Sequence, residues 1–143
     1  MPLEDDQNIQ LILREAKVIA VVGASKKPWR DSYRIANFLR ECGYTVFPVN
    51  PLYSDIEGVR CFPSVQSIGT AVDIVDVFRN PDAADEAARD AIASHAKVLW
   101  LQLGVINPMA ATRAEAAGMK VIMDRCIAVE YSRLMRSNIR EKS

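Results

Sequence analysis

The sequence is poor in histidine and cysteine, which supply many zinc sites and catalytic sites. Among 143 residues there is one histidine, His95, and three cysteines that are spaced neither for zinc nor for a disulfide framework. The 18 basic and 18 acidic residues cancel, which leaves no overall positive field to hold nucleic acid. These absences argue against a metal centre, a histidine-based catalytic set and a nucleic-acid-binding protein.

Long apolar runs are also absent. None approaches the roughly 20 residues of a membrane-spanning helix, and the acidic start of the chain lacks the basic segment of a signal peptide. An odd number of scattered cysteines is typical of a reducing compartment. We therefore expect a cytoplasmic protein without a membrane partner, folded as one domain over residues 1–143.

Short apolar segments alternate with helix-forming segments along the chain. Strands are predicted at 18–22, 44–49, 72–78, 97–101 and 120–123, with a very short one at 59–62. Helices are predicted at 5–16, 31–42, 80–94, 107–118 and 127–136, and the polar tail 137–143 is expected to fray. This alternation predicts an α/β, Rossmann-like fold: a mostly parallel five-stranded sheet, in the order 3-2-1-4-5, with helices on both faces.

The stretch from Val18 to Ser32 reads as a buried strand, a tight glycine turn and a helix start. Gly23 ends the apolar run, and Asp31 and Ser32 are predicted to cap the helix that follows. The N–H groups of such a turn and the positive end of a helix dipole favour an anion. Ligands of parallel sheets bind beyond the carboxyl ends of the strands. Four turns are therefore expected to meet there, namely 23–25, 49–51, 78–81 and 102–105.

The glycine pattern of a nicotinamide site is incomplete. The dinucleotide fingerprint requires glycine at positions 23, 25 and 28, but the last two are Ser25 and Pro28. The second strand ends at Asn50, and no carboxylate follows before Asp55 to bind a ribose. No Walker sequence is present. The sequence therefore favours the fold of a nucleotide-binding domain without favouring NAD.

Basic side chains surround the predicted turn. Lys26, Lys27 and Arg30 suit a ligand with several phosphates, although solvated loop charges are the alternative. Arg79 follows a predicted strand at the same edge, where it either contacts a ligand or pairs with the aspartate at 76 or 82. Trp29 either stacks on an adenine or covers a hydrophobic edge. In 72–78 acidic and apolar residues alternate, which predicts that one face of this strand is less buried.

Six short motifs follow one another along the chain. They are Gly-Ala-Ser-x-x-Pro from position 23, Ser-Tyr-Arg-Ile-Ala from 32, Tyr-x-Val-x-Pro-Val-Asn-Pro from 44, Asp-Ile-Val-Asp-Val-Phe-Arg from 73, Trp-Leu-Gln-Leu-Gly from 100 and Met-Asp-Arg-Cys from 123. Together they resemble the single-domain CoA-binding proteins, which are similar to the CoA-binding domain of the succinyl-CoA synthetase α subunit. The resemblance extends from about Val18 to Leu134 and implies a Rossmann-like domain that binds coenzyme A.

The resemblance also assigns the parts of coenzyme A to segments of this chain. The diphosphate is expected on the turn, at Gly23, Ala24, Ser25, Lys26, Lys27, Arg30 and Ser32. The nucleotide end is expected along Val49, Asn50, Pro51 and Tyr53, although Asn50 alternatively caps a turn. The remaining walls and the approach to the pantetheine arm are expected from Phe78, Arg79, Pro81, Gln102 and Gly104.

Cys126 follows Asp124 and Arg125 at the end of the last predicted strand. Arg125 would favour a thiolate, and a thiol beside the CoA thiol is able to form a mixed disulfide; a packed cysteine is the alternative. Without a nucleophile–base pair, the sequence indicates a non-catalytic module that binds CoA or an acyl-CoA. The alternatives are an NAD(P)- or CoA-dependent enzyme using Cys126, and a scaffold subunit with a vestigial pocket. The apolar terminal elements are compatible with a homodimer.

Overall fold

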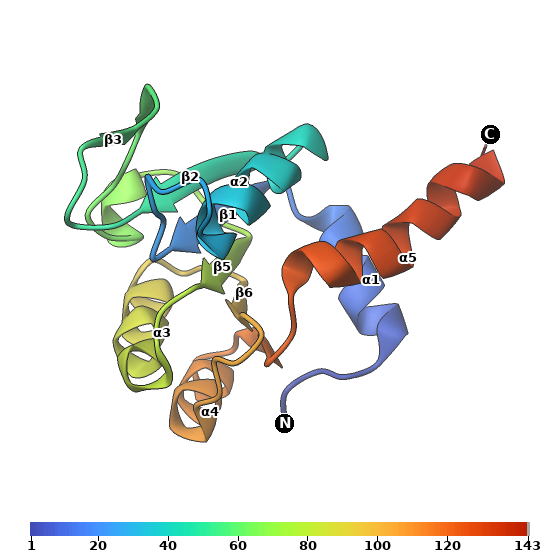
Figure 1. Cartoon of the computed structure of the whole chain (residues 1–143). Helices are drawn as coiled ribbons and strands as arrows, with labels where there is room; N and C mark the ends of the chain where they lie inside the picture. Colours follow the sequence, from blue (N-terminus) through green and yellow to red (C-terminus); the bar gives the residue numbers. More distant parts are fainter. Residues whose placement is uncertain (143) are drawn as a thin grey trace.

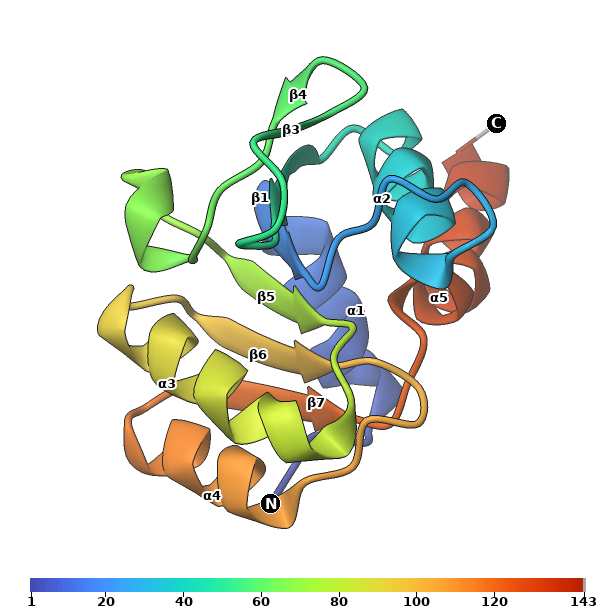
Figure 2. The same ribbon diagram turned by 60° about the vertical axis from the view of Figure 1, so that its left-hand side comes forward.

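One parallel sheet forms the centre of the protein. The computed structural model describes residues 1–142, with side chains described as far as Met135. Five strands pair in the order β2-β1-β5-β6-β7, all parallel (Figure 2). They are β1 (Val18–Val22), β2 (Thr45–Val49), β5 (Ile74–Val77), β6 (Val98–Leu101) and β7 (Lys120–Met123). The predicted α/β class with a mostly parallel five-stranded sheet is confirmed.

Helices cover both faces of this sheet (Figure 1). One face carries α1 (Asp6–Glu15), α2 (Asp31–Glu41) and α5 (Ile127–Lys142), and the other carries α3 (Ala84–Ala93) and α4 (Pro108–Ala116). Side chains that alternate along each strand enter two separate cores, because successive residues of a strand point to opposite faces. The tail 137–143, which the sequence predicts to fray, has side chains outside the described residues.

The expected strand order differs at one edge. The order 3-2-1-4-5 requires a further strand outside β2, but β2 is the edge strand, and beyond it the chain makes a single parallel bridge between Val49 and Phe62. Pro63 follows directly and has no N–H to continue the pairing. The preceding residues form a small antiparallel hairpin of β3 (Asp55–Ile56) and β4 (Val59–Arg60). The fifth strand of the sheet is therefore β7, at the opposite edge.

The helix starts follow from local sequence. Asp5 accepts the N–H of Asn8 at the start of α1 (3.0 Å). Asn80 accepts the N–H of Ala83 at the short 3-10 helix η2 (Pro81–Ala83), and Asn107 does the same for α4. A second 3-10 turn, η1 (Gln66–Ile68), precedes β5. Within the described residues, no helix has both the length and the apolarity needed to cross a membrane.

The prediction that one face of the β5 strand is less buried is wrong. All four residues of β5 are buried, and Asp76 is 0% exposed between Val21 of β1 and Trp100 of β6. Neither carboxyl oxygen of Asp76 has a hydrogen-bond partner among the described residues. Burial raises the pKa of Asp76 well above its ordinary value. Burial therefore favours the neutral form of this side chain in the folded protein.

Replacing Asp76 by asparagine tests that protonation state, because an amide keeps the shape and stays neutral. In the wild type, the unfolded chain loses the Asp76 proton above its ordinary pKa of 3.8 while the folded chain keeps it. The free energy of unfolding should then fall by up to about 1.4 kcal/mol per pH unit as pH rises from about 4.5. Asp76→Asn should lack this slope in urea unfolding measured at several pH values. Parallel curves for the two proteins would show that Asp76 ionises alike in both states.

Candidate functional site

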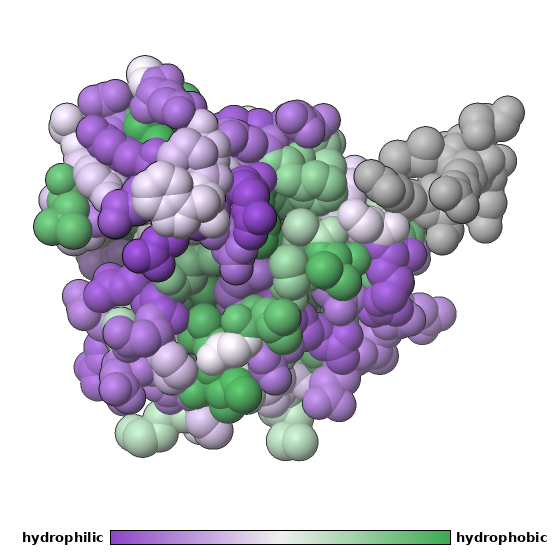
Figure 3. Space-filling view, viewed as in Figure 1, coloured by the Kyte–Doolittle hydropathy of each residue, from purple (hydrophilic) through white to green (hydrophobic). Residues whose placement is uncertain are grey.

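A groove of about 870 Å³ opens at the carboxyl ends of the central strands and against the start of α2. In Figure 3 the surface there is hollowed and has both hydrophilic and hydrophobic residues around it. Most residues singled out in the sequence line this groove: Gly23, Ala24, Ser25, Lys27, Arg30, Ser32, Asn50, Tyr53, Phe78, Arg79, Gln102 and Cys126. The turns after β1, β2, β5, β6 and β7 thus meet at one edge of the sheet, as parallel strands require.

A second groove of about 680 Å³ lies beside the first, toward α3. Val49 and Pro51 line this second groove and not the first. Gly23, Asn50 and Arg79 line both, so these three residues form the ridge between the two grooves. The residues expected along the nucleotide end of a ligand are therefore divided between two hollows.

Three other expected residues line neither groove. Lys26 places its Nζ 5.1 Å from the centre of the Tyr53 ring, beside the first groove. The Pro81 carbonyl accepts a hydrogen bond from the Asn107 side chain (2.9 Å). The N–H of Gly104 donates to Asp124 Oδ1 (2.8 Å), so Pro81 and Gly104 connect loops rather than face the groove.

Several residues that the sequence does not single out as ligand contacts complete the walls of the first groove. These are Asp31, Arg34, Ile35, Phe38, Leu103, Val105 and Ala128, together with Trp29, whose role the sequence left open. Helical spacing from Ser32 would have found Ile35 and Phe38 on the same side of α2. Leu103 and Val105 belong to the turn 102–105, which the sequence predicts at this place without singling out either side chain. The position of Ala128 follows from tertiary packing, for which the sequence holds no short-range signal.

The turn after β1 requires glycine at position 23. Gly23 has φ +88°, and a Cβ there would lie 2.9 Å from the Phe78 carbonyl oxygen and 3.2 Å from Arg79 Cδ. Its N–H donates to the Val49 carbonyl (2.9 Å). Asn50 then joins the two turns, because its Nδ2 donates to the Ala24 carbonyl (2.8 Å). Asn50 Oδ1 also accepts the N–H of residue 52 (2.9 Å), so both ends of this amide hold the turns in place.

The start of α2 is uncapped. The prediction that Asp31 and Ser32 cap this helix is wrong: the N-cap residue is Arg30, and no side chain caps the helix. Within the described part of the chain, the N–H groups of Asp31 and Ser32 have no acceptor. The Ser32 side chain is 5% exposed, lines the groove and makes no described hydrogen bond. Unused donors and a positive dipole end therefore face the groove.

Positive charge predominates along the groove. Lys27, Arg30, Arg34 and Arg79 line it, and the acidic residue Asp31 pairs with Arg34. Arg79 forms no described ion pair, so the alternative pairing with an aspartate at 76 or 82 is not found. The guanidinium of Arg79 is thus available between the two grooves.

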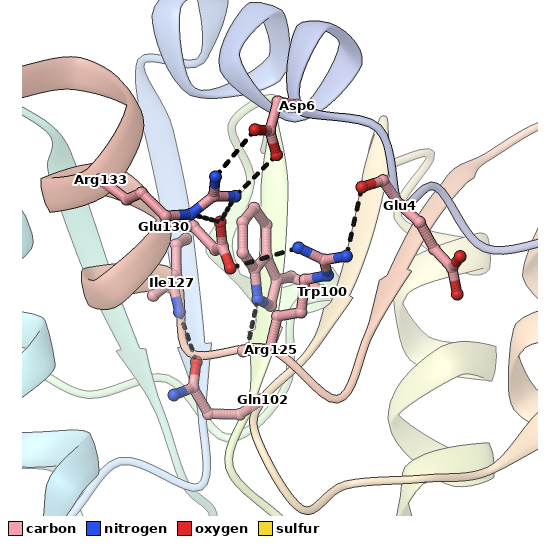
Figure 4. Close-up of polar contacts among 8 residues, drawn as sticks. All are labelled: Glu4, Asp6, Trp100, Gln102, Arg125, Ile127, Glu130 and Arg133. Atoms are coloured by element: carbon pink, nitrogen blue, oxygen red, sulfur yellow. Dashed lines mark hydrogen bonds and ion pairs between the residues drawn. The ribbon is translucent and has the colours of Figure 1, made fainter. Parts of the chain in front are cut away.

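The loop after β7 is held by the sheet beneath it (Figure 4). The indole N–H of the fully buried Trp100 donates to the Arg125 carbonyl (2.8 Å). Gln102, which is 6% exposed, accepts the Ile127 N–H through Oε1 (3.2 Å). These two bonds fix the peptide groups on either side of Cys126, whose thiol side chain lines the groove.

A chain of ion pairs extends from this loop to α1 (Figure 4). Arg125 contacts Glu130 (3.3 Å) and donates to the Glu4 carbonyl (3.2 Å). Arg133 bridges Glu130 and Asp6, and its hydrogen bonds lower the pKa of Asp6. The guanidinium of Arg125 is therefore engaged with Glu130 rather than with the thiol of the neighbouring cysteine. In the described region, no group of three His, Cys, Asp or Glu side chains is placed to hold a metal ion.

The chain is similar to a known protein family and to several known proteins. A family model described as a CoA binding domain matches residues 17–132. The YneT protein of Bacillus subtilis strain 168 is 36% identical over 124 residues, which are 87% of this chain and 92% of that protein. A solved structure of a protein from Pyrococcus horikoshii OT3 is similar with a TM-score of 0.90 and 39% identity, covering 94% of this chain and 96% of that one.

One larger enzyme shares the same segment. The ADP-forming acetate–CoA ligase I of Archaeoglobus fulgidus is 28% identical over 123 residues, which cover 79% of this chain but 18% of the ligase. The similarity therefore concerns one part of that enzyme, and the chain spans less than a fifth of its length.

Gly23→Ala tests the close approach between the two turns. Both the positive φ and the contact with Phe78 oppose a side chain, so the free energy of unfolding should fall by about 2–5 kcal/mol. Gly118→Ala is the matched control, because Gly118 has a similar φ of +91° but nothing within 4 Å of an added Cβ. The control should lose only about 1–2 kcal/mol from backbone strain. Equal losses in urea unfolding would mean that the Phe78 contact adds no constraint.

Proposed function

This chain belongs to the CoA-binding domain family, and on that premise we propose that it binds coenzyme A, or an acyl-CoA, in the groove at the carboxyl ends of its parallel strands. The observation that carries the proposal is the uncapped start of α2. There the buried Ser32 hydroxyl and two backbone N–H groups lack partners and face the groove. Donors of this kind are satisfied by a phosphate group at a helix N-terminus.

The charges around the groove suit a ligand with more than one phosphate. CoA carries a diphosphate and a ribose 3′-phosphate, and several cations are within reach of these groups. Lys27, Arg30 and Arg79 line the groove without a described ion pair, and Lys26 lies next to Tyr53 at its side. Arginine fits phosphate oxygens with paired N–H donors. The ribose of an NAD would instead require a carboxylate after β2, where this chain has Asn50.

The other walls suit the adenosine and the pantetheine arm. Tyr53 and Trp29 offer aromatic surface on the side of the turn, and Phe78, Leu103 and Val105 form an apolar wall. That wall leads to Gln102, whose amide nitrogen has no acceptor among the described residues and is able to donate to a pantetheine carbonyl. The groove thus offers polar contacts at both ends and apolar contact between them, as small-molecule sites commonly do.

The proposed role is that of a binding module that carries or senses the ligand. Among the described residues that line the groove, Asp31 is the acidic one, and it is paired with Arg34. His95 follows the end of α3 and does not line the groove. The groove residues therefore bind and orient a ligand, but they do not supply a free general base.

Isothermal titration calorimetry tests this function directly. Titration of the reduced protein with CoA should give saturable binding with one site per chain, and NAD should bind more weakly or not at all. Absence of any CoA binding at millimolar concentration would overturn the proposal. Tighter binding of NAD than of CoA would favour the nicotinamide alternative instead.

The lysines of the turn give a second, electrostatic test. Replacing Lys26 and Lys27 by alanine should weaken CoA binding about two- to thirtyfold at low ionic strength and flatten its salt dependence. The control replaces Lys17 and Lys120 by alanine. Both are exposed at the amino-terminal ends of strands, away from the groove, and the two double variants change the net charge equally. If the two double variants show the same affinities and salt slopes, these lysines do not contact the ligand.

A further inference from the structure

The far end of the groove is lined by a cysteine and by a side chain with an unused hydrogen-bond donor. Cys126 and Gln102 both line the groove, and the bond from the Ile127 N–H to Gln102 Oε1 (3.2 Å) places the Gln102 amide beside the Cys126–Ile127 peptide. Gln102 is 94% buried, since 6% of its surface is exposed. Its Nε2 has no described partner, and Figure 4 shows this nitrogen pointing away from the bonded loop.

The Gln102 side chain is 6% exposed, and its N–H₂ group, which lacks a described acceptor, keeps its accessible surface in the groove. This group is therefore placed to donate a hydrogen bond to a ligand that provides an acceptor. The matching group on a pantetheine arm is an amide carbonyl, which lies a few bonds from the terminal sulfur. An acceptor bound at Gln102 therefore brings that sulfur to the side of the groove where Cys126 lies.

We propose that Cys126 is a covalent acceptor site for CoA, which it takes up by thiol–disulfide exchange with a disulfide of CoA. The inference rests on the proposed CoA function of the groove. Gln102 acts as a positioning residue, because it holds both the Ile127 N–H of the loop and the arm of the ligand. The product is a protein whose groove and thiol are both occupied by one CoA moiety.

The exchange is balanced without a further oxidant. The Cys126 thiol releases its proton to solvent, and the thiolate attacks one sulfur of the CoA disulfide. A new Sγ–S bond forms, the original S–S bond breaks, and the departing CoA thiolate takes a proton from solvent. One disulfide thus replaces another, and a small thiol reverses the reaction by the same steps.

The surroundings of Cys126 favour this chemistry over acyl transfer. Cys126 directly precedes the first residue of α5, a helix of 16 residues, and its carbonyl accepts the Glu130 N–H (3.0 Å). Thiol–disulfide exchange requires only an accessible thiol that reacts as its thiolate, whereas hydrolysis of an acylated cysteine would require a general base that the described groove lining does not supply.

The other cysteines lie outside the groove and serve as internal controls. Cys61 is 4% exposed, and burial raises the pKa of its thiol. Cys42 is the C-cap residue of α2 and lines a separate hollow near α1 and α5. A CoA disulfide bound at the phosphate turn should therefore modify Cys126 and spare both of these.

Mass spectrometry of the intact, fully reduced protein after incubation with CoA disulfide tests the proposal. We expect one adduct, with the mass of CoA less two hydrogens, that maps to Cys126 and is removed by dithiothreitol. Cys126→Ser should form no adduct, while Cys42→Ser should form it as the wild type does. An adduct on Cys42 or Cys61, or none at all, would overturn the proposal.

Comparison with a small disulfide separates a built site from an exposed thiol. Cys126 should react with CoA disulfide about tenfold faster, or more, than with hydroxyethyl disulfide, because the bound ligand raises the local concentration of its sulfur. Equal rates would mean that Cys126 is merely accessible, and would overturn the proposal.

Gln102→Glu tests the positioning role, because it keeps an acceptor for the Ile127 N–H and removes the N–H₂ donor. The rate with CoA disulfide should fall about two- to tenfold, while the rate with hydroxyethyl disulfide should fall less. A common fall for both reagents would assign the effect to the added charge and remove Gln102 from the site.

Calorimetry with reduced CoA distinguishes this inference from the proposed function. Reversible CoA binding by the wild type without any adduct from CoA disulfide would overturn the covalent site and leave the binding function standing. Failure of both measurements would overturn both.

Discussion

The contact between Gly23 and Phe78 is the constraint on which the groove depends. A methyl group at position 23 would lie 2.9 Å from the Phe78 carbonyl oxygen. The backbones of the turns after β1 and β5 are therefore so close that no side chain fits between them at this position. Arg79 follows Phe78 and therefore lies beside the turn after β1, and Asn50 holds the turn after β2 against that same turn. Three strand ends are thus gathered around one residue that has no side chain.

A second set of contacts organises the opposite end of the groove. Trp100 lies in β6, and Gln102 directly follows that strand. The side chain of each forms a hydrogen bond with the backbone of the loop that follows β7. Arg125 leaves the thiol free and continues into a chain of ion pairs that reaches α1. The groove therefore has cations and unpaired N–H groups at one end and a neutral amide at the other, which is the polarity that the proposed ligand requires.

Local and periodic features were predictable from the sequence, whereas tertiary pairings were not. Apolar runs and glycine turns located the strands of the sheet, and the order of six motifs identified the family, which the match over residues 17–132 confirms. The alternation of acidic and apolar residues in 72–78 wrongly predicts an exposed face. Asp76 is buried because it has an apolar partner on the strand at each side. The Arg133–Asp6 pair and the place of Ala128 in the groove wall depend on how separate segments pack, which no short window of sequence records.

The uncapped start of α2 affects which substitutions at position 30 would stabilise the protein. Serine, threonine, aspartate or asparagine at an N-cap typically contributes about 1 kcal/mol of stability, and Arg30 forgoes that contribution. A side-chain oxygen at position 30 would satisfy the helix and fill the site at which an anion would bind. With the proposed ligand, a capping residue at position 30 would therefore raise the stability of the helix and at the same time compete with binding.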